Sequence, residues 1–577
     1  MIRYFGAVAL CVLLGLNVAL GQDNDPPQLT LSSPTRGEIV PAGTVRVAGT
    51  VTDASGVSIL VVNGVPVIPD AAGNFAELVA VRAGMNAIEV EAFDPYANAT
   101  QVRTVVLAGT FRPLTQGVPN ALAARLNRPG FVAIEALAAQ ELARADLGAL
   151  VRAQNPLYED TSGLTQVTVT AEAASFGTPR LSLDPQAGGL AVRVEVPAVD
   201  MTVRLRGRLG FVSFNRTVRT TATLATITGR ASLVGQPGGG LRSQMTNTQV
   251  ALDGFRFDIS GFPGFLESLI RGVVRRVLVD QIKKQIETTI PAQVDQALTV
   301  FNQPVTKTVL GRPVTLRLVP NQVVVDPDGA FFRADADVAI PALPGHAGPG
   351  SLATPGAAPL LGPTRAFALS LDDDLLNRVG YAAWQGGLMD FSLDRAAATQ
   401  LGLPAWLPLE AFWLQAFLPS LIGHVDPRDP LEFELESRLP PVFSARPGAE
   451  PLQVSVGEFV VSIYAAPAGR ARQLVLEVTT QVEFAVGVTV DAQNTLRLSV
   501  AGRPTVRTEV TASPLAQVNA TGVATFVDFL IPPVIQLLPR AWSGFPLPVV
   551  PGGVQPRGLE LRADGPAGDH LTLRGDL

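Results

Sequence analysis

The stretch from Phe262 to about Ile290 constrains the fold more than any other part of the sequence. Its apolar residues recur at intervals of three and four, so on a helix they share one face, opposite Arg271 and Arg275. Toward Pro291 the stripe turns slowly around the helix axis. Such a helix must lie along a curved apolar surface, which is either an ordinary core or the wall of a ligand pocket. The stripe begins with Phe262, Phe265, Leu266, Leu269, Ile270, Val273 and Val277.

The whole chain is unusually apolar. Hydrophobic residues make up 47% and charged residues 16%, and the mean hydropathy is +0.28. This composition excludes a disordered, collagen-like or coiled-coil protein. The one run apolar enough to suggest a bilayer is Phe5–Leu20, which follows Arg3 and precedes a small-x-small sequence at 19–21. Residues 1–21 are therefore a predicted signal peptide, and we expect an exported protein of the periplasm or the cell exterior.

The predicted signal peptide contains the only cysteine, Cys11. The exported chain would then have no disulfide and would depend on burial alone for its stability. A large disulfide-free exported protein is more typical of bacterial than of animal secretion.

Residues 22–109 alternate polar and apolar side chains between closely spaced turn signals. Val45–Val51 is typical of a strand, and Asn63-Gly64 is typical of a tight hairpin. Short strands at this spacing predict a small β-sandwich. The string Val61–Val67 resembles part of the immunoglobulin-like modules of bacterial surface and exported proteins, which serve as spacers or adhesive units.

Beyond residue 110 one order of elements occurs twice, as a strand, a helix, a series of strands and an apolar helix. We expect one unit over residues 110–340 and a second over residues 366–577. Residues 341–365 are rich in Pro and Gly and predict an extended linker without helix or strand. The expected elements include a strand at Gly130–Ile134 and a helix at Ala136–Val151, then a strand at Phe367–Leu371 and a helix at Asp372–Gln385. A further helix is expected at Phe526–Leu538, broken by Pro532-Pro533.

Four short strings occur in the order in which one known family carries them, over about 450 residues. They are Asn127–Val132, Gly264–Gln285, Ala368–Met389 and Gly544–Leu573. Together they resemble the family of bactericidal/permeability-increasing protein, lipopolysaccharide-binding protein and cholesteryl ester transfer protein, the tubular lipid-binding superfamily.

The resemblance implies a β-rich α+β fold. Behind the N-terminal sandwich, two tandem barrels would each wrap a twisted antiparallel sheet around a long helix. A central sheet would join them in a boomerang shape, and each barrel would hold an apolar pocket for acyl chains. The stripe from Phe262 to Val277 would then line the first pocket. The candidates for the second pocket are Leu375, Leu376, Val379, Tyr381 and Trp384.

Charge is unevenly distributed along the chain. Residues 22–110 hold nine acids and four bases, residues 111–345 hold 19 acids and 24 bases, and residues 346–577 hold 22 acids and 15 bases. The middle part is therefore basic, with a net charge of +5, and would attract anionic partners.

Arginines gather within the basic part. Residues 201–252 contain seven arginines and neither Asp nor Glu. Arg204, Arg206 and Arg208 alternate, so on a strand they project from one face. They are either a contact for anionic lipid headgroups, since guanidinium binds phosphate bidentately, or a solvated strand face. The arginines assigned to headgroup or membrane contact are Arg204, Arg206, Arg208, Arg216 and Arg219.

The three histidines accompany no nucleophile motif and no metal-ligand motif. They are His346, His424 and His570. His424 with Asp426 and Asp429 is either a metal site or a turn. We therefore expect no enzymatic activity, no catalytic residue, no metal site and no cofactor.

The run Asp372–Asp374 is either a calcium site or a group of acids at the positive end of a helix. We adopt the second interpretation, because carboxylates stabilise a helix N-terminus. Export and the net charge of −6 argue against nucleic-acid binding.

These observations predict non-enzymatic lipid binding or lipid transfer. Phospholipids or lipopolysaccharide-like amphiphiles would be held in apolar barrel pockets, with peripheral membrane contact through the arginines. The alternative is a structural or adhesive cell-surface protein that acts through its immunoglobulin-like module.

Overall fold

The computed structural model describes residues 23–577 except for short internal stretches. The chain divides into two compact units. The first comprises residues up to 38, 43–81 and 86–106, and the second comprises residues 39–42, 82–85 and 107–577. The protein is rich in β-structure, with several sheets and few helices. Not described are 145–146, 162–164, 210, 236–239, 259–270, 273, 277–278, 281–282, 285–286, 289–290, 293–294, 296–302, 310–311, 342–345, 355, 405, 408, 491–495, 516–517 and 536–555.

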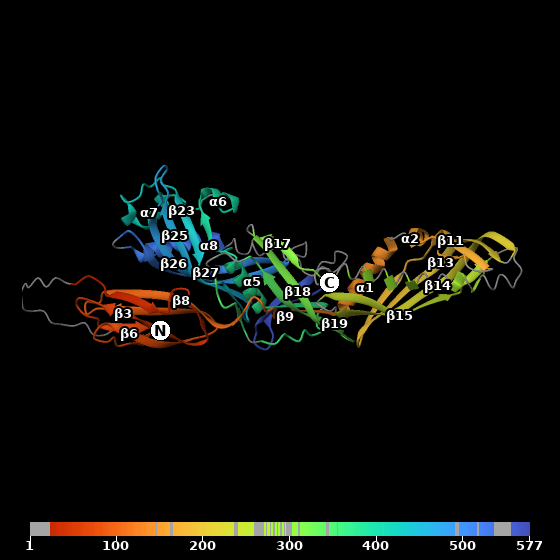
Figure 1. Ribbon diagram of the computed structural model, residues 1–577, viewed down its shortest axis with the longest axis horizontal. Coiled ribbons are helices and arrows are strands. Elements are labelled where there is room, and N and C mark those ends of the chain that lie inside the picture. The colour runs from red at the N-terminus through yellow and green to blue at the C-terminus, as the bar shows by residue number, and fades with distance from the viewer. Residues whose placement is uncertain are drawn as a thin grey trace, which may run out of the picture. The chain divides into compact units, whose positions relative to one another are not determined.

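Two sheets make up the N-terminal part (Figure 1). Buried side chains alternate with partly exposed ones in β7, where Ile88 and Val90 are fully buried. Asn63 and Gly64 both have positive φ and form the predicted tight turn between β4 and β5. One sheet has the order β1 (Gln28–Ser33), β3 (Gly43–Thr52), β6 (Asn74–Val81); the other has the order β2 (Ile39–Pro41), β8 (Ala99–Arg112), β7 (Gly84–Phe93), β4 (Ile59–Val62), β5 (Val65–Pro66).

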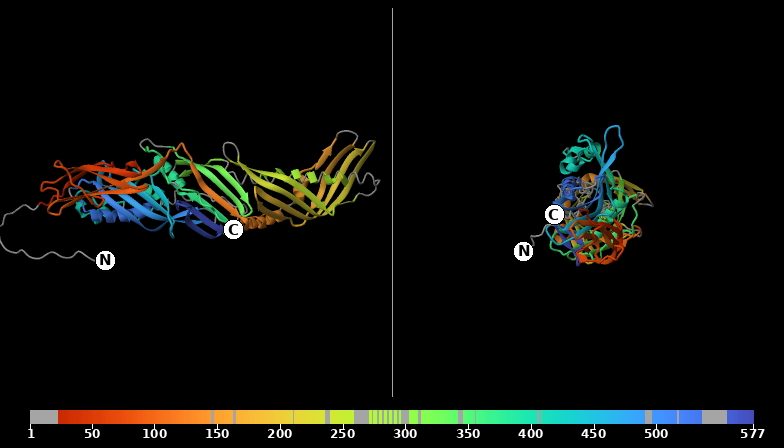
Figure 2. Two further views of the ribbon diagram at one scale, coloured as in Figure 1. Left: turned by 90° about the horizontal axis from the view of Figure 1, so that it is seen from below. Right: turned by 90° about the vertical axis from the view of Figure 1, so that its left-hand side faces the viewer.

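A seven-stranded sheet of long strands follows, and Figure 2 shows these strands, in yellow and yellow-green, curving together. Its inner face carries a small apolar cluster that includes Val169, Val203, Leu205 and Val218. The main order is β10 (Tyr158–Asp160), β11 (Thr165–Ser175), β13 (Gly189–Leu209), β14 (Val212–Gly235), β15 (Leu241–Asp253), with β12 (Arg180–Gln186) on β13 and β16 (Arg256–Asp258) on β14.

Two helices precede this sheet, α1 (Arg128–Arg144) and α2 (Leu147–Ala153). The strand expected at Gly130–Ile134 is wrong, because these residues already belong to α1. Pro129 is the second residue of the helix, where a missing N–H costs nothing. The sequence signal of a short apolar run did not distinguish a strand from the first turns of a helix.

A second seven-stranded sheet combines segments that lie far apart in the sequence. Its central strand, β21, pairs with β9 on one side and with β29 on the other, so that Leu369 lies opposite both Ala124 and Leu573. The order is β17 (Val305–Val309), β18 (Arg312–Asp326), β19 (Gly329–Ala339), β9 (Val118–Asn127), β21 (Phe367–Asp372), β29 (His570–Asp576), β28 (Arg557–Asp564).

The last sheet packs on the apolar helix α8 (Ala520–Ile535), and together they contain the largest apolar cluster described. Phe526 and Leu530 of α8 are buried against strand residues such as Phe433. The break expected at Pro532-Pro533 is wrong, because the helix continues through both prolines as far as Ile535. The sheet has the order β22 (Phe391–Leu393), β23 (Leu431–Ser437), β25 (Leu452–Ala465), β26 (Gln473–Val490), β27 (Leu496–Ala512), with β24 (Val442–Ala445) on β25.

Short helices complete the second half of the chain. The predicted helix at Asp372–Gln385 is present as α5 (Asp373–Gln385). No helix among the described residues combines the length and apolar character needed to span a membrane. The others are α6 (Arg395–Gln400), α7 (Ala411–Phe417) and the 3-10 turn η1 (Pro419–Leu421).

The Pro/Gly-rich stretch 341–365 contains more structure than the sequence predicts. Ser351–Ala353 form the short strand β20, which pairs with the end of β8. Leu352 and Leu361 are buried at 4% exposure each. The three residues of β20 include neither Pro nor Gly, and the free edge of β8 supplies their hydrogen-bond partners.

We predict that Phe526→Ala lowers the free energy of unfolding by about 3–5 kcal/mol, because the ring is fully buried between Phe417 and Phe433. Phe529→Ala, on the same helix at 38% exposure, is the matched control and should cost about 1 kcal/mol or less. Urea unfolding monitored by circular dichroism measures both. Equal losses for the two variants would show that α8 is not packed as described.

Candidate functional site

The alternate arginines of β13 project from one face of the sheet. Val203 and Leu205 are fully buried on the inner face, and the arginines between and beyond them lie on the outer face. Arg206 and Arg208 are exposed, whereas Arg204 is half-buried.

Arg204 and Arg219 are each paired with a carboxylate. Arg204 forms an ion pair with Glu172, the extra residue of a bulge in β11. Arg219 Nε lies 3.0 Å from Asp200 Oδ1, and this hydrogen bond lowers the pKa of Asp200 below its ordinary value. Both acids lie outside the acid-free stretch 201–252, and Asp200 immediately precedes it. Arg216 is exposed. It lies opposite Leu205 in the β13–β14 ladder and therefore projects from the inner face of the sheet.

The hairpin that joins β13 to β14 ends in exposed apolar side chains. Phe211 is 97% exposed and Val212 is 66% exposed. Arg208 lies opposite Ser213, immediately beyond this tip. The tip therefore presents an aromatic ring to solvent beside the guanidinium groups of β13.

The seven stripe residues assigned to the first pocket all lie outside the described residues. They are Phe262, Phe265, Leu266, Leu269, Ile270, Val273 and Val277. The neighbouring Val274 is helical and fully buried in the apolar cluster of β11, β13 and β14. Arg271 and Arg275, expected on the opposite face, are exposed.

The five α5 residues assigned to the second pocket do not share one wall. Leu375 and Val379 pack in a cluster with β9, β18 and β19. Leu376, Tyr381 and Trp384 pack against the cluster around α8. Trp384 Nε1 also donates a hydrogen bond of 2.6 Å to the carbonyl of Ser437. Helix α5 therefore lies between two apolar clusters and contacts protein side chains on both sides.

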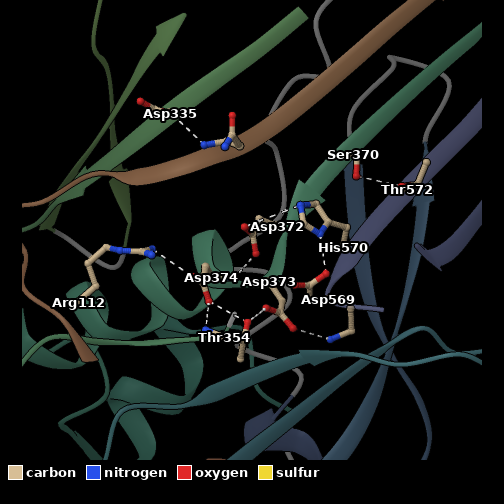
Figure 3. A network of polar contacts seen from close by, with 12 residues as sticks. Arg112, Asp335, Thr354, Ser370, Asp372, Asp373, Asp374, Asp569, His570 and Thr572 are labelled. Atoms are coloured by element: carbon tan, nitrogen blue, oxygen red, sulfur yellow. Dashed lines mark hydrogen bonds and ion pairs between the residues drawn. The ribbon is translucent and has the colours of Figure 1, made fainter. Parts of the chain in front are cut away.

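A buried polar centre lies at the N-terminus of α5 (Figure 3). Asp372 is the N-cap, and its Oδ1 accepts a hydrogen bond of 3.0 Å from the backbone N–H of Asp374. Thr354 Oγ1 lies 2.9 Å from Asp373 Oδ1 and 3.0 Å from Asp374 Oδ1. Arg112 Nη1 lies 3.1 Å from Asp374 Oδ2. The interpretation of these acids as helix-terminal residues is therefore confirmed.

The C-terminal strand β29 adds a histidine to this centre. His570 pairs with Asp372 in the β21–β29 ladder. Its Nδ1 lies 2.8 Å from Asp569 Oδ1, and its Nε2 lies 3.8 Å from Asp372 Oδ2. Figure 3 shows the imidazole between the two carboxylates. Asp373 N–H donates to the carbonyl of Asp569, which ties the helix start to the strand.

Burial dominates the electrostatics of the centre. Together with the charges of Asp374 and Asp373, it raises the pKa of Asp372 to about 8. Burial likewise raises the pKa of Asp373 to about 7, against opposing hydrogen bonds from Ala445 and Thr354. At neutral pH these carboxyl groups therefore bind protons in the absence of another cation.

The other two histidines lie elsewhere. His346 Nε2 is hydrogen-bonded to the carboxylate of Asp390, and its ring makes an edge contact with Trp384. Near His424, the carboxylates of Asp426 and Asp429 accept backbone N–H groups of their own turn. These hydrogen bonds favour the turn interpretation of that sequence.

Sequence reasoning identified the acids of the centre and missed their partners. Asp569 and His570 are nearly 200 residues from Asp372 in the sequence, and only the β21–β29 pairing brings them together. The local signals were weak, because a histidine next to an aspartate occurs often in turns.

We predict that the protein loses stability as pH rises from about 5 to about 8.5 in buffer containing EDTA. The folded pKa values of Asp372 and Asp373 lie above the ordinary 3.8, so the folded state holds protons that the unfolded state has released. The contribution is fully present below pH 3.8 and disappears as pH passes 7–8. Thermal unfolding at a series of pH values measures the effect.

Asp372→Asn provides the control for this pH dependence. Asn still caps the helix and has no proton to release, so its melting temperature should fall less with pH and should exceed that of the wild type at about pH 8.5. Parallel pH profiles for the two proteins would contradict the assignment.

Comparisons with known proteins bear on the N-terminal part first. Residues 27–109 match the family model described as glucodextranase, domain B. This match and the two sheets support the predicted immunoglobulin-like module. No curated protein matches the sequence.

Solved structures resemble the chain at low identity. The crystal structure of lipopolysaccharide binding protein is 16% identical, with a TM-score of 0.42, and the match covers 80% of this chain and 99% of that chain. P47 from Clostridium botulinum A2 is 7% identical, with a TM-score of 0.21, and the match covers 80% and 99%. The fibronectin(III)-like modules of Clostridium thermocellum CbhA are 12% identical, with a TM-score of 0.14, and cover 33% and 92%. The matched family thus concerns the N-terminal module alone, and at these TM-scores the solved structures assign no activity to the chain.

Proposed function

We propose that the protein binds anionic amphiphiles, phospholipids or lipopolysaccharide-like molecules, without breaking a bond in them. The observation that carries the proposal is the tip of the β13–β14 hairpin. An almost fully exposed phenylalanine, Phe211, lies there beside the exposed Arg206 and Arg208. An apolar ring next to guanidinium groups matches the chemistry of an anionic membrane surface, where acyl chains lie beneath phosphates.

The expected energies are sufficient for reversible membrane contact. Burial of the Phe211 side chain is worth about 1.5–3 kcal/mol. Each arginine near an anionic surface adds about 1 kcal/mol. Arg204 and Arg219 contribute less, because Glu172 and Asp200 already neutralise them.

We propose that the acyl chain of the lipid binds in the first half of the protein. The finer fold that we propose is the one implied by the four sequence strings, with two tubes, each a twisted sheet wrapped on a long helix. Val274, which falls within the sequence of the stripe from Phe262 to Val277, is buried against the inner side of β11, β13 and β14. This contact supports placing the stripe along that inner side. The five α5 residues contact protein on both sides, and their role in lining a second pocket stays a prediction.

The proposal also concerns where the protein is located and whether it acts as an enzyme. The N-terminal 21 residues support export to the periplasm or the cell exterior. The absence of a catalytic motif from the sequence supports binding or transfer rather than catalysis.

The alternative is a structural or adhesive surface protein, and the match of residues 27–109 to a domain model favours it. Native mass spectrometry of the purified full chain separates the two. Co-purified phospholipid supports the lipid proposal. A chain that carries no lipid and takes up no fluorescent fatty acid would leave the adhesive function as the better explanation.

We predict that Phe211→Ser and the double variant Arg206→Ser/Arg208→Ser each weaken binding to vesicles of phosphatidylglycerol and phosphatidylcholine by on the order of tenfold. The arginine variant should also lose most of the salt dependence of binding. Vesicle co-sedimentation of the full chain measures both effects.

The matched control is Arg180→Ser/Arg193→Ser. It removes the same charge from β12 and from the far end of β13, where Arg193 pairs with Glu195. Binding of this control should equal that of the wild type. Undiminished binding by the two tip variants would refute the assignment of the tip.

A further inference from the structure

The N-terminus of α5 holds more buried negative charge than its neighbours neutralise. Four carboxylates are buried there, at 9% exposure for Asp372, 3% for Asp373 and Asp374, and 6% for Asp569. Arg112 pairs with Asp374. The nearby Arg378 directs its guanidinium N–H groups to backbone carbonyls of residues 112, 113 and 116. Uncompensated buried carboxylates are costly, so the centre favours an additional cation.

The imidazole of His570 is the second, independent indication of a ligand. The residue is 1% exposed, and among the described residues its Nε2 has no hydrogen-bond partner. That nitrogen points toward Asp372, with 3.8 Å between Nε2 and Oδ2. A buried ring nitrogen without a hydrogen bond is rare, because its removal from water is then not compensated by a new partner.

We propose that this centre binds one divalent cation that accepts nitrogen and oxygen ligands together, of which Zn²⁺ is the representative. His570 Nε2 and Asp372 Oδ2 would be two of its ligands. Their separation is less than twice a zinc–ligand bond of about 2.0–2.2 Å, so one ion can contact both atoms. Oxygen atoms of Asp372, Asp373 and Asp374 lie within 4.8 Å of one another, in a group that does not include His570, so the two neighbouring carboxylates supply negative charge around the ion.

Asp569 acts as a positioning residue for the imidazole. With Nδ1–H donating to Asp569 Oδ1 at 2.8 Å, the lone pair of the neutral ring is on Nε2, directed at Asp372. A carboxylate that orients a metal-binding histidine in this way is usual in zinc sites. Gly356 leaves room for it, since a Cβ there would lie 1.3 Å from Asp569 Oδ2.

The ligand chemistry also selects among cations. Calcium takes six to eight oxygen ligands, and magnesium retains several waters. A buried site with one imidazole and short carboxylates suits Zn²⁺ better. Bound there, the ion would link β29 to the start of α5 and thereby hold the C-terminal strand in the sheet.

The test uses the full chain, stripped of metal with EDTA and titrated with Zn²⁺ alone. We expect isothermal calorimetry to give one high-affinity Zn²⁺ per chain and thermal unfolding to shift upward on binding. Co²⁺ in place of Zn²⁺ should give visible absorption bands of a nitrogen- and oxygen-ligated ion. These readouts involve no lipid, so their outcome is independent of the vesicle experiments.

His570→Gln and Asp372→Asn test the ligands. Both replacements keep a hydrogen-bonding side chain of similar size, and Asn still caps α5, so we expect folded proteins. Each should weaken Zn²⁺ binding at least tenfold, and Asp569→Asn should weaken it less while changing the Co²⁺ spectrum.

Two controls exclude other sites. His424→Gln removes a histidine from a turn, and Asp53→Asn alters the carboxylate group of Asp23, Asp53 and Asp94 in the N-terminal part. Both should bind Zn²⁺ like the wild type. Failure of the wild type to bind Zn²⁺, or unchanged binding by His570→Gln, would overturn the proposal.

Discussion

The pairing of β21 with β9 and β29 is the constraint on which the second half of the molecule depends. These three strands come from residues 118–127, 367–372 and 570–576, and their ladders hold the middle and the C-terminal end of the chain in one sheet. The same pairing sets the start of α5, because β21 ends at the N-cap Asp372. It also determines which residue meets that N-cap, since the register places His570 directly opposite it. A shift by one residue would turn His570 to the other face of the sheet.

Burial at the end of β21 then decides the electrostatics. Carboxylates at an exposed helix N-terminus are ordinary and mildly stabilising. Enclosed by β20, β24 and β29, the same residues lose water, and the pKa values of Asp372 and Asp373 rise to about 8 and about 7. The centre must be neutralised by protons, by Arg112 or by a bound cation. Its polar side chains are therefore tied to the stability of the sheet, whereas Arg206 and Arg208 near the β13–β14 tip are exposed to solvent.

Several features followed from local sequence. Alternation predicted the strands of the N-terminal sheets, Asn63-Gly64 predicted their tight turn, and the acids at 372–374 predicted the start of a helix. The apolar spacing of 526–538 predicted a buried helix there, although α8 begins earlier, at Ala520. Two other features could not be predicted from local sequence signals. The run Gly130–Ile134 has the composition of a strand, yet Pro129 starts a helix there, and the stretch around Leu352 forms a strand because the edge of β8 is available to it.

The sequence by itself determined the periodic properties of this protein: which strand faces are apolar, which arginines share a face, and where carboxylates favour a helix start. These properties depend on residues within a few positions of one another, so period and propensity are enough to read them. Only the tertiary structure decided the partners: Glu172 and Asp200 for the arginines, the two apolar clusters on either side of α5, and His570 for Asp372. Such contacts join residues from separate strands, and their physical basis is the register of sheet pairing, which no single segment encodes.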